Sequence, residues 1–130
     1  MNDEMQRTHD DWKIIQTIVQ SNQAARYAQF AAGSVEGYPN HDEAELALLK
    51  ILAFYSNADR EAVERLHHGS GLYNGNKWAD DTHRNRQLDK AIEWAENALK
   101  TAYNDVTGVL KMPDPSPEWP EVKPLKASQL

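Results

Sequence analysis

Cysteine is absent from this sequence of 130 residues, and long apolar runs are absent as well. Without cysteine the chain can form neither a disulfide framework nor a thiolate metal site, and nothing points to an oxidising compartment. No segment approaches the roughly 18 uninterrupted apolar residues that a membrane helix needs. Residues 1–11 are polar and acidic where a secretory signal would be basic and then apolar. We therefore expect a cytoplasmic protein with no membrane contact.

Positive charge is scarce, because 14 lysine and arginine residues face 20 acidic ones and the formal net charge is -6. Broad affinity for nucleic acids comes mainly from lysine and arginine displacing counterions at phosphates. The charge balance therefore excludes a generally basic DNA-binding surface. Any contact with DNA must be local and weak.

Strand-like alternation and internal repeats are also missing, which argues against sheets and solenoids. The 40% hydrophobic and 26% charged residues suit short amphipathic helices with charged outer faces. We predict an all-α fold, a single small bundle of four to five helices in residues 10–104. Residues 1–9 are expected to be a flexible N-terminus. Residues 105–130 hold five of the six prolines and are expected to form an extended proline-rich tail, since proline cannot continue a helix.

The spacing of apolar residues locates the helices. Residues 10–32 form either one long helix or two helices broken near Ser21 and Asn22. Asn40 can cap a helix over residues 41–55, which is apolar nearly all round and so belongs in the middle of the bundle.

The second half of the bundle follows the same pattern. A short helix capped by Asp59 or Asn57 should end at His68, before Gly69. The clearest amphipathic stripe predicts a last helix over residues 82–103. Between them, residues 70–82 predict an ordered loop anchored by Leu72, Tyr73 and Trp78.

Signals for catalysis or metal binding are few. His41, Asp42 and Glu45 could share one helix face and bind a cation or transfer protons, although acids are also favoured at a helix N-terminus by the helix dipole. His67 and His68 are adjacent and point about 100° apart on a helix, so they cannot both face one metal ion. Neither a phosphate loop nor a nucleophile elbow occurs. We predict no catalytic residue, no metal and no cofactor.

One stretch concentrates basic and aromatic residues in this acidic chain: Arg65, His68, Lys77, Trp78, Arg84, Arg86 and Lys90. Cations beside an indole suit phosphate contact combined with base stacking. The alternative is that Trp78 pins its loop to the core while the cations form solvated ion pairs with Asp80, Asp81 and Glu93. The sequence leaves both open.

Several motifs in order carry a family resemblance: His41-Asp42-Glu43-Ala44-Glu45-Leu46-Ala47-Leu48, Leu52-Ala53-Phe54-Tyr55, Asp59, Val63-Glu64-Arg65-Leu66, Ser70-Gly71-Leu72 and Lys77-Trp78. Their spacing resembles the helix-bundle domain of phage- and plasmid-type DNA primase-polymerases. The sequence departs from the family pattern at His68, where an arginine is frequent. It also has Thr82-His83-Arg84-Asn85-Arg86 in place of a Thr-Tyr or Ser-Tyr-Gly element.

This resemblance implies a non-catalytic accessory domain of a mobile-element replication protein. Such a domain contacts single-stranded template DNA, the initiating nucleoside triphosphate, or both, beside primase-polymerase and helicase or ATPase domains in cis or in trans. The expected contact residues are Arg65, His68, Ser70, Lys77, Trp78, Arg84 and Arg86.

Two other functions remain open. One is an adaptor that docks a helicase or polymerase subunit through apolar helix faces. The other is a small enzyme, which would need a pocket that joins His41 or His68 to carboxylates.

Overall fold

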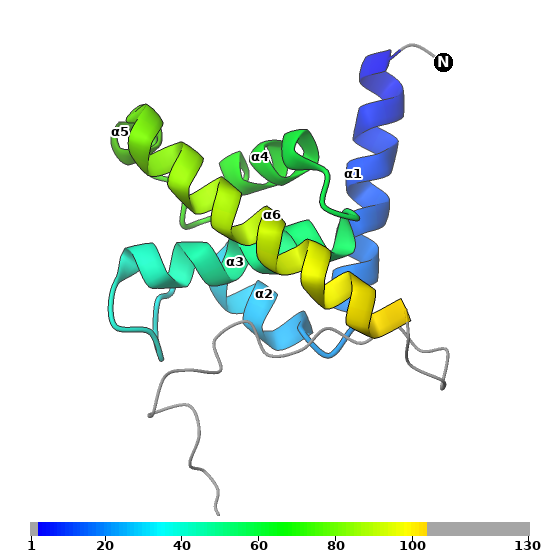
Figure 1. Cartoon of the computed structure of the whole chain (residues 1–130), viewed down its shortest axis with the longest axis horizontal. Helices are drawn as coiled ribbons and strands as arrows, with labels where there is room; N and C mark the ends of the chain where they lie inside the picture. The colour runs from blue at the N-terminus through cyan, green and yellow to red at the C-terminus, as the bar shows by residue number, and fades with distance from the viewer. Residues whose placement is uncertain (1–2, 104–130) are drawn as a thin grey trace, which may run out of the picture.

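The structure, a computed structural model, describes residues 3–103, and all regular secondary structure in that range is helical (Figure 1). Its six helices are α1 (Asp3–Val19), α2 (Ala24–Ala31), α3 (His41–Tyr55), α4 (Arg60–His68), α5 (Gly75–Trp78) and α6 (Asp81–Tyr103). The all-α prediction is confirmed. The predicted proline-rich tail lies outside the described residues. Among the helices of residues 3–103, none combines the length and apolar character that crossing a membrane requires.

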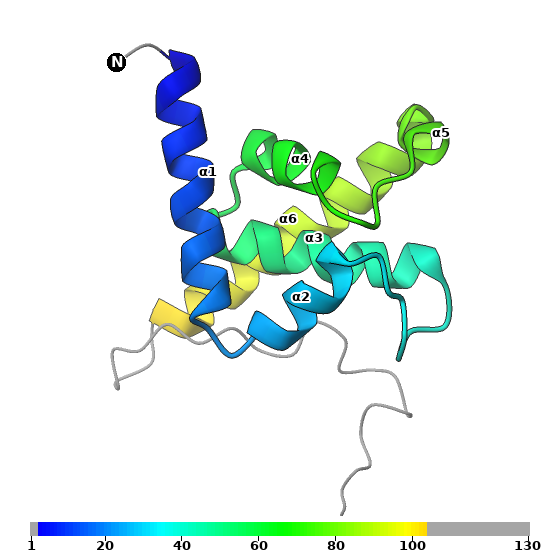
Figure 2. The same ribbon diagram turned by 180° about the vertical axis from the view of Figure 1, so that it is seen from behind.

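Helix α3 is the centre of the bundle, as its sequence predicts. It crosses α6, and α2, α4 and the C-terminal end of α1 pack around the pair (Figures 1 and 2). Nine of its residues are buried: Ala44, Glu45, Ala47, Leu48, Leu49, Ile51, Leu52, Ala53 and Phe54. Eight of these are apolar, so their removal from water is a main stabilising contribution to the fold. Glu45 is the exception.

The first helical segment is two helices, α1 and α2, which resolves the alternative that the sequence left open. The backbone leaves the helical path after Val19, where the Ser21 hydroxyl accepts a hydrogen bond from the Gln23 amide at 3.0 Å. Helix α1 begins at Asp3, seven residues before the expected start, so part of the N-terminus expected to be flexible has a helical backbone. Its N-terminal end projects beyond the rest of the bundle (Figure 2).

The predicted caps of α3 and α4 are present. Asn40 Oδ1 accepts a hydrogen bond from the Glu43 amide at 2.9 Å, and Asp59 Oδ1 accepts one from the Ala62 amide at 3.3 Å. Helix α5 was not predicted, because a single turn is too short to show a period. The Asn74 side chain caps this turn, because its Oδ1 accepts hydrogen bonds from the backbone amides of Asn76 and Lys77.

Gly71 lies where the loop after α4 crosses the end of α2. A Cβ atom at this position would lie 2.4 Å from the Gly33 nitrogen and 2.6 Å from the Ala31 carbonyl oxygen. Both are backbone atoms that cannot swing aside, so only glycine fits. On one side Ser70 accepts a hydrogen bond from the Leu72 amide, and on the other Leu72 is buried in the core. The Ser-Gly-Leu motif is thus explained as a tight crossing of two backbones.

We expect Gly71→Ala to lower the free energy of unfolding by about 2–4 kcal/mol, because the backbones must separate. Urea unfolding followed by circular dichroism would measure the loss. Gly69→Ala is the matched control, since its Cβ would meet only the Leu66 carbonyl at an ordinary 3.7 Å, and it should change stability by less than about 1 kcal/mol. Equal stability of the two variants would contradict the crossing.

Candidate nucleic-acid interface

A buried carboxylate organises the end of the bundle where α3, α4 and α6 meet. The Glu45 side chain is fully buried, and its Oε1 accepts hydrogen bonds from His83 Nε2 at 2.9 Å and Gln87 Nε2 at 3.0 Å. Gln87 also donates to the Asp42 carbonyl at 2.9 Å. Burial raises the pKa of Glu45, but its favourable interactions with His67, Gln87 and His83 outweigh burial and hold that pKa below its usual value. The carboxylate is therefore ionised inside the fold.

His67 approaches the same carboxylate from α4. Its Nε2 lies 3.0 Å from Glu45 Oε2, but the two atoms lack the alignment of a hydrogen bond, so the contact is an ion-pair distance only. The fully buried ring also packs against the Trp78 indole, with centroids 4.3 Å apart, and meets Tyr73 edge-on. Trp78 in turn donates from its indole nitrogen to Glu64 at 3.3 Å.

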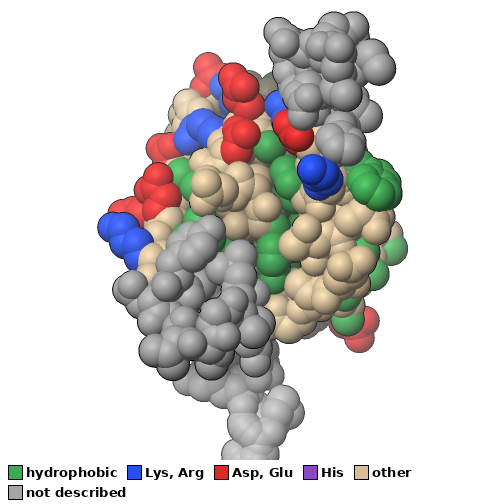
Figure 3. Space-filling view, turned by 90° about the vertical axis from the view of Figure 1, so that its right-hand side faces the viewer, with side chains coloured by type: hydrophobic (Ala, Val, Ile, Leu, Met, Phe, Trp, Pro, Cys, Tyr) green, Lys and Arg blue, Asp and Glu red, His purple; other side chains and the backbone are tan. Residues whose placement is uncertain are grey.

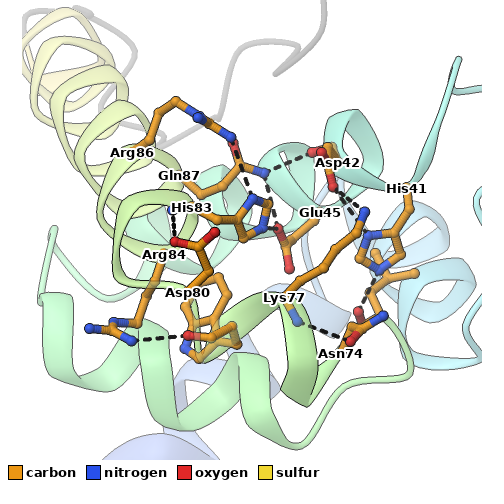
Figure 4. Close-up of polar contacts among 12 residues, drawn as sticks. His41, Asp42, Glu45, Asn74, Lys77, Asp80, His83, Arg84, Arg86 and Gln87 are labelled. Carbon is orange, nitrogen blue, oxygen red and sulfur yellow. Dashed lines mark hydrogen bonds and ion pairs between the residues drawn. The ribbon is translucent and has the colours of Figure 1, made fainter.

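Trp78 therefore anchors its loop to the core. Of the two roles that the sequence left open for it, this is the structural one and not base stacking. Only 3% of its surface is exposed, so no face of the indole is open to a base. Lys77, its neighbour in the single turn of α5, points outward instead. Its ammonium lies 2.7 Å from Asp42 Oδ1 and holds the pKa of Asp42 below its usual value (Figure 4). The Lys-Trp pair thus combines a core anchor with a surface cation.

His41, Asp42 and Glu45, which the sequence placed on one helix face, do lie close together at the start of α3. One ligand atom from each residue lies within 4.8 Å of the others. However, Lys77 already supplies a cation to Asp42, and His41 Nε2 donates to the Leu72 carbonyl at 2.7 Å. The acids of this group are neutralised by protein side chains, and the arrangement favours a structural role.

The N-terminus of α6 brings two more predicted cations to the same end of the bundle. Asp80 caps the helix by accepting from the Thr82 amide at 2.9 Å and the His83 amide at 3.4 Å. Arg84 is turned back, pairing with Asp81 and donating to the Trp78 carbonyl at 3.0 Å. Arg86 is exposed and points along the other side of the helix, with Nη2 3.5 Å from His83 Nδ1.

An open surface pocket of about 430 Å³ lies at this end of the bundle, where α5 meets the start of α6. It is lined by Asn76, Lys77, Asp80, Thr82, His83 and Arg86. Of the seven predicted contact residues, the structure therefore brings Lys77 and Arg86 to one pocket. Within the described residues Arg86 pairs with no carboxylate, so its guanidinium is open to an anion.

The remaining predicted contact residues have structural partners away from the pocket. Arg65 joins α4 to α1 through a two-pronged pair with Asp11, at 3.0 and 2.9 Å, which raises its pKa further. Ser70 donates to the His67 carbonyl at 2.8 Å within its turn. His68 is exposed and lies against Tyr73, whereas its neighbour His67 is buried, so the two rings diverge as predicted.

Sequence reasoning missed His67, His83 and Gln87 as a cluster around Glu45. Two signals were available. Glu45 is one of only two clearly polar residues in the interior of an otherwise apolar helix, and His83 and Gln87 stand four apart, on one face of the last helix. The sequence does not show that α4 packs beside Glu45 of α3, and this packing is what brings His67 to the carboxylate.

The face of α6 that carries Arg86 continues into a second hollow. Lys90 and Trp94, four and eight residues further on, line an open hollow of about 440 Å³ together with Glu43, Leu46, Lys50, Glu93 and Asn97. Lys50 stands over the Trp94 ring, 5.4 Å from its centroid. Trp94 is partly exposed, so this hollow offers the accessible indole that Trp78 does not.

Comparison with known proteins gives one family. The family model described as the NrS-1 polymerase HBD domain matches residues 41–109, more than half of the chain and every described helix from α3 onward. Neither the curated proteins nor the solved structures contain a match to this chain. The matched residues include the Glu45 cluster, the Lys77 and Arg86 pocket and the face of α6 beyond it. The chain therefore belongs to the NrS-1 polymerase HBD domain family, and its helices from α3 onward correspond to a helical accessory domain of the primase-polymerase type, not to the catalytic part.

Proposed function

We propose that this chain is a non-catalytic module of a mobile-element DNA replication protein, which acts in the cytoplasm and holds single-stranded template DNA or the initiating nucleotide. The observation that carries the proposal is the convergence of Lys77, Arg86 and His83 on one open pocket in a chain of net charge -6. Primase-polymerase and helicase or ATPase domains, in cis or in trans, would perform the chemistry. Family membership supports this division of labour.

The charges of the pocket suit a phosphodiester. Arg86 offers a planar guanidinium that pairs with no carboxylate of the described residues, and Lys77 is held by Asp42, which a phosphate must displace. Asp80 also lines the pocket, but its Oδ1 already accepts two backbone hydrogen bonds. Two cations with nearby acids predict a local, salt-sensitive contact rather than tight binding.

The second hollow gives the strand a continuation. From Arg86 to Trp94 is a little over two helical turns, or about 12 Å at 1.5 Å per residue. With phosphates at Arg86 and Lys90, the adjoining base would reach the Trp94 indole and displace Lys50, which stands over the ring. Glu43 and Glu93 at its edge keep the hollow near neutrality, so stacking and not charge would dominate there.

Fluorescence anisotropy with a short labelled oligothymidine, with and without nucleoside triphosphate, tests the proposal. We expect measurable binding whose logarithm falls linearly with the logarithm of salt concentration. Three cation–phosphate contacts, at Lys77, Arg86 and Lys90, give a slope of about -2.1, because each contact on a single strand contributes roughly 0.7. Absence of salt-sensitive binding to either probe would refute the proposal.

Trp94→Leu should weaken oligothymidine binding roughly 5- to 100-fold, since stacking of one base contributes about 1–3 kcal/mol. Trp94→Phe, which keeps an aromatic face, should retain most of the affinity. The same anisotropy titration measures both variants. Unchanged affinity in Trp94→Leu would place the bases elsewhere.

One observation favours the adaptor as a second candidate. On α1, Trp12 is 58% and Val19 is 44% exposed, two helical turns apart on the same side. Figure 3 views the side of the molecule on which α1 stands and shows hydrophobic side chains at the surface there. A Trp12→Glu, Val19→Glu variant that no longer co-purifies with its co-expressed polymerase or helicase part, yet still binds oligothymidine, would support docking through α1.

A further inference from the structure

We propose that His83 is a proton-linked phosphate ligand of the pocket: Glu45 fixes one ring nitrogen from inside, and the other takes up a proton when a phosphate enters. This inference rests on the proposed function and names a contact residue that the family motifs do not supply, since His83 stands in the segment that departs from them. The two ring nitrogens of His83 have different surroundings: Nε2 contacts the buried Glu45, and Nδ1 lies beside Arg86 at the pocket.

The inner nitrogen is fixed by the buried carboxylate. Glu45 Oε1 lies 2.9 Å from His83 Nε2 and accepts from it, which requires the proton of the neutral ring to be on Nε2. The amide of Gln87 donates to the same oxygen at 3.0 Å and holds the carboxylate in place. The His83 ring therefore has one orientation and one tautomer.

The outer nitrogen faces the pocket. With Nε2 protonated, Nδ1 carries a lone pair, and its partner is the Arg86 guanidinium at 3.5 Å, a long contact (Figure 4). A phosphate oxygen bound by Arg86 at this pocket would draw the guanidinium away from the ring. Nδ1 could then bind a proton and donate a hydrogen bond to the same phosphate.

The charges around His83 explain why a phosphate would change its protonation. Cations oppose a charge on the ring: Lys77 from α5, Arg84 and Arg86 from α6. Acids favour it: Glu45 and Asp42 from α3 and Asp80 at the start of α6. Two further histidines, His41 of α3 and His67 of α4, adjoin these acids and compete for them. A phosphate neutralises the cations and adds negative charge, so the balance shifts toward the imidazolium.

The consequence is that phosphate binding and proton uptake are coupled. Affinity for a phosphodiester should rise as pH falls through the range in which histidines titrate, by at most about tenfold per pH unit for one proton. The sign follows from linkage, because a ligand that favours the protonated form binds better where that form is populated.

The test is the pH dependence of oligothymidine affinity at constant ionic strength, from about pH 8 to about pH 6. A probe with a 5′-hydroxyl end has no group that titrates in this range, so a change reports on the protein. We expect wild-type affinity to rise at least about threefold. His83→Gln can still donate to Glu45 but cannot take up a proton, so its affinity should be flat with pH. His68→Gln, which alters an exposed histidine, should keep the wild-type profile.

A second measurement does not depend on a variant that folds well. The NMR titration midpoint of the His83 ring in the wild-type protein should move to higher pH when oligothymidine is added. An unmoved midpoint, a flat wild-type profile, or a pH response retained in His83→Gln would overturn the inference while leaving the proposed function intact. Absence of binding at every pH would overturn both.

Discussion

Glu45→Leu is expected to lower the free energy of unfolding by about 3–5 kcal/mol, the range found when one partner of a buried charged pair is removed. The substitution leaves the inward nitrogens of His83 and Gln87 without their acceptor, and His67 without its nearby carboxylate, in a buried part of the bundle. A buried donor without a partner carries its full desolvation cost. Urea unfolding of the variant and the wild type measures the difference.

Glu43→Gln is the control for this result. Glu43 lies two residues earlier on the same helix, is partly exposed, and its backbone amide rather than its side chain makes the cap of α3. We expect its replacement to change stability by less than about 0.5 kcal/mol. If Glu45→Leu cost no more than this control, the carboxylate would not organise the cluster.

The same carboxylate makes stability depend on acidity. The folded protein holds the pKa of Glu45 below its unfolded value, which is about 4.3 for glutamate. Its contribution is therefore fully present above that unfolded value and is lost as pH falls through the folded one. Wild-type stability should fall steeply below about pH 4, and Glu45→Leu should show a shallower fall in the same range.

Lys77→Ala combined with Arg86→Ala is expected to weaken oligothymidine binding by at least about tenfold and to reduce the salt slope by roughly 1.4. Both side chains are exposed and line the same pocket, so their removal should leave the fold intact. Anisotropy over a range of salt concentrations gives affinity and slope together. An unchanged slope would show that the pocket does not hold phosphate.

Two further variants serve as comparisons: one should strengthen oligothymidine binding, and the other should lower stability without changing binding. Asp42→Asn removes the carboxylate that competes for Lys77, so it should strengthen binding severalfold while the salt slope stays near that of the wild type. Arg65→Gln removes a predicted contact residue that instead joins α4 to Asp11 of α1, so it should cost stability and leave binding unchanged. A loss of binding in Arg65→Gln at full stability would return that residue to the interface.

The Lys77-Trp78 pair shows why short motifs carry mixed information. The two residues are adjacent in one turn, yet Trp78 packs on His67 in the core while Lys77 reaches Asp42 at the surface. The sequence left two interpretations open: phosphate contact plus stacking, or a tryptophan anchored in the core beside solvated ion pairs. The fold separates these roles and places a partly exposed indole, that of Trp94, sixteen residues later on α6.

Although it left open the break near Ser21 and the choice between Asp59 and Asn57 as a cap, the sequence by itself determined the all-α class, the central position of α3 and the cap at Asn40. Each of these depends on local chemistry: apolar spacing, backbone hydrogen bonding by a side chain, or an apolar surface too large to expose. The tertiary structure decided which of the cations line the pocket. Arg65 and Arg84 were equal candidates with Lys77 and Arg86 until the fold brought Asp11 to one and the Trp78 carbonyl to the other. The cluster around Glu45 was likewise set by three helices meeting, because ion pairs and buried hydrogen bonds depend on distances that no local pattern encodes.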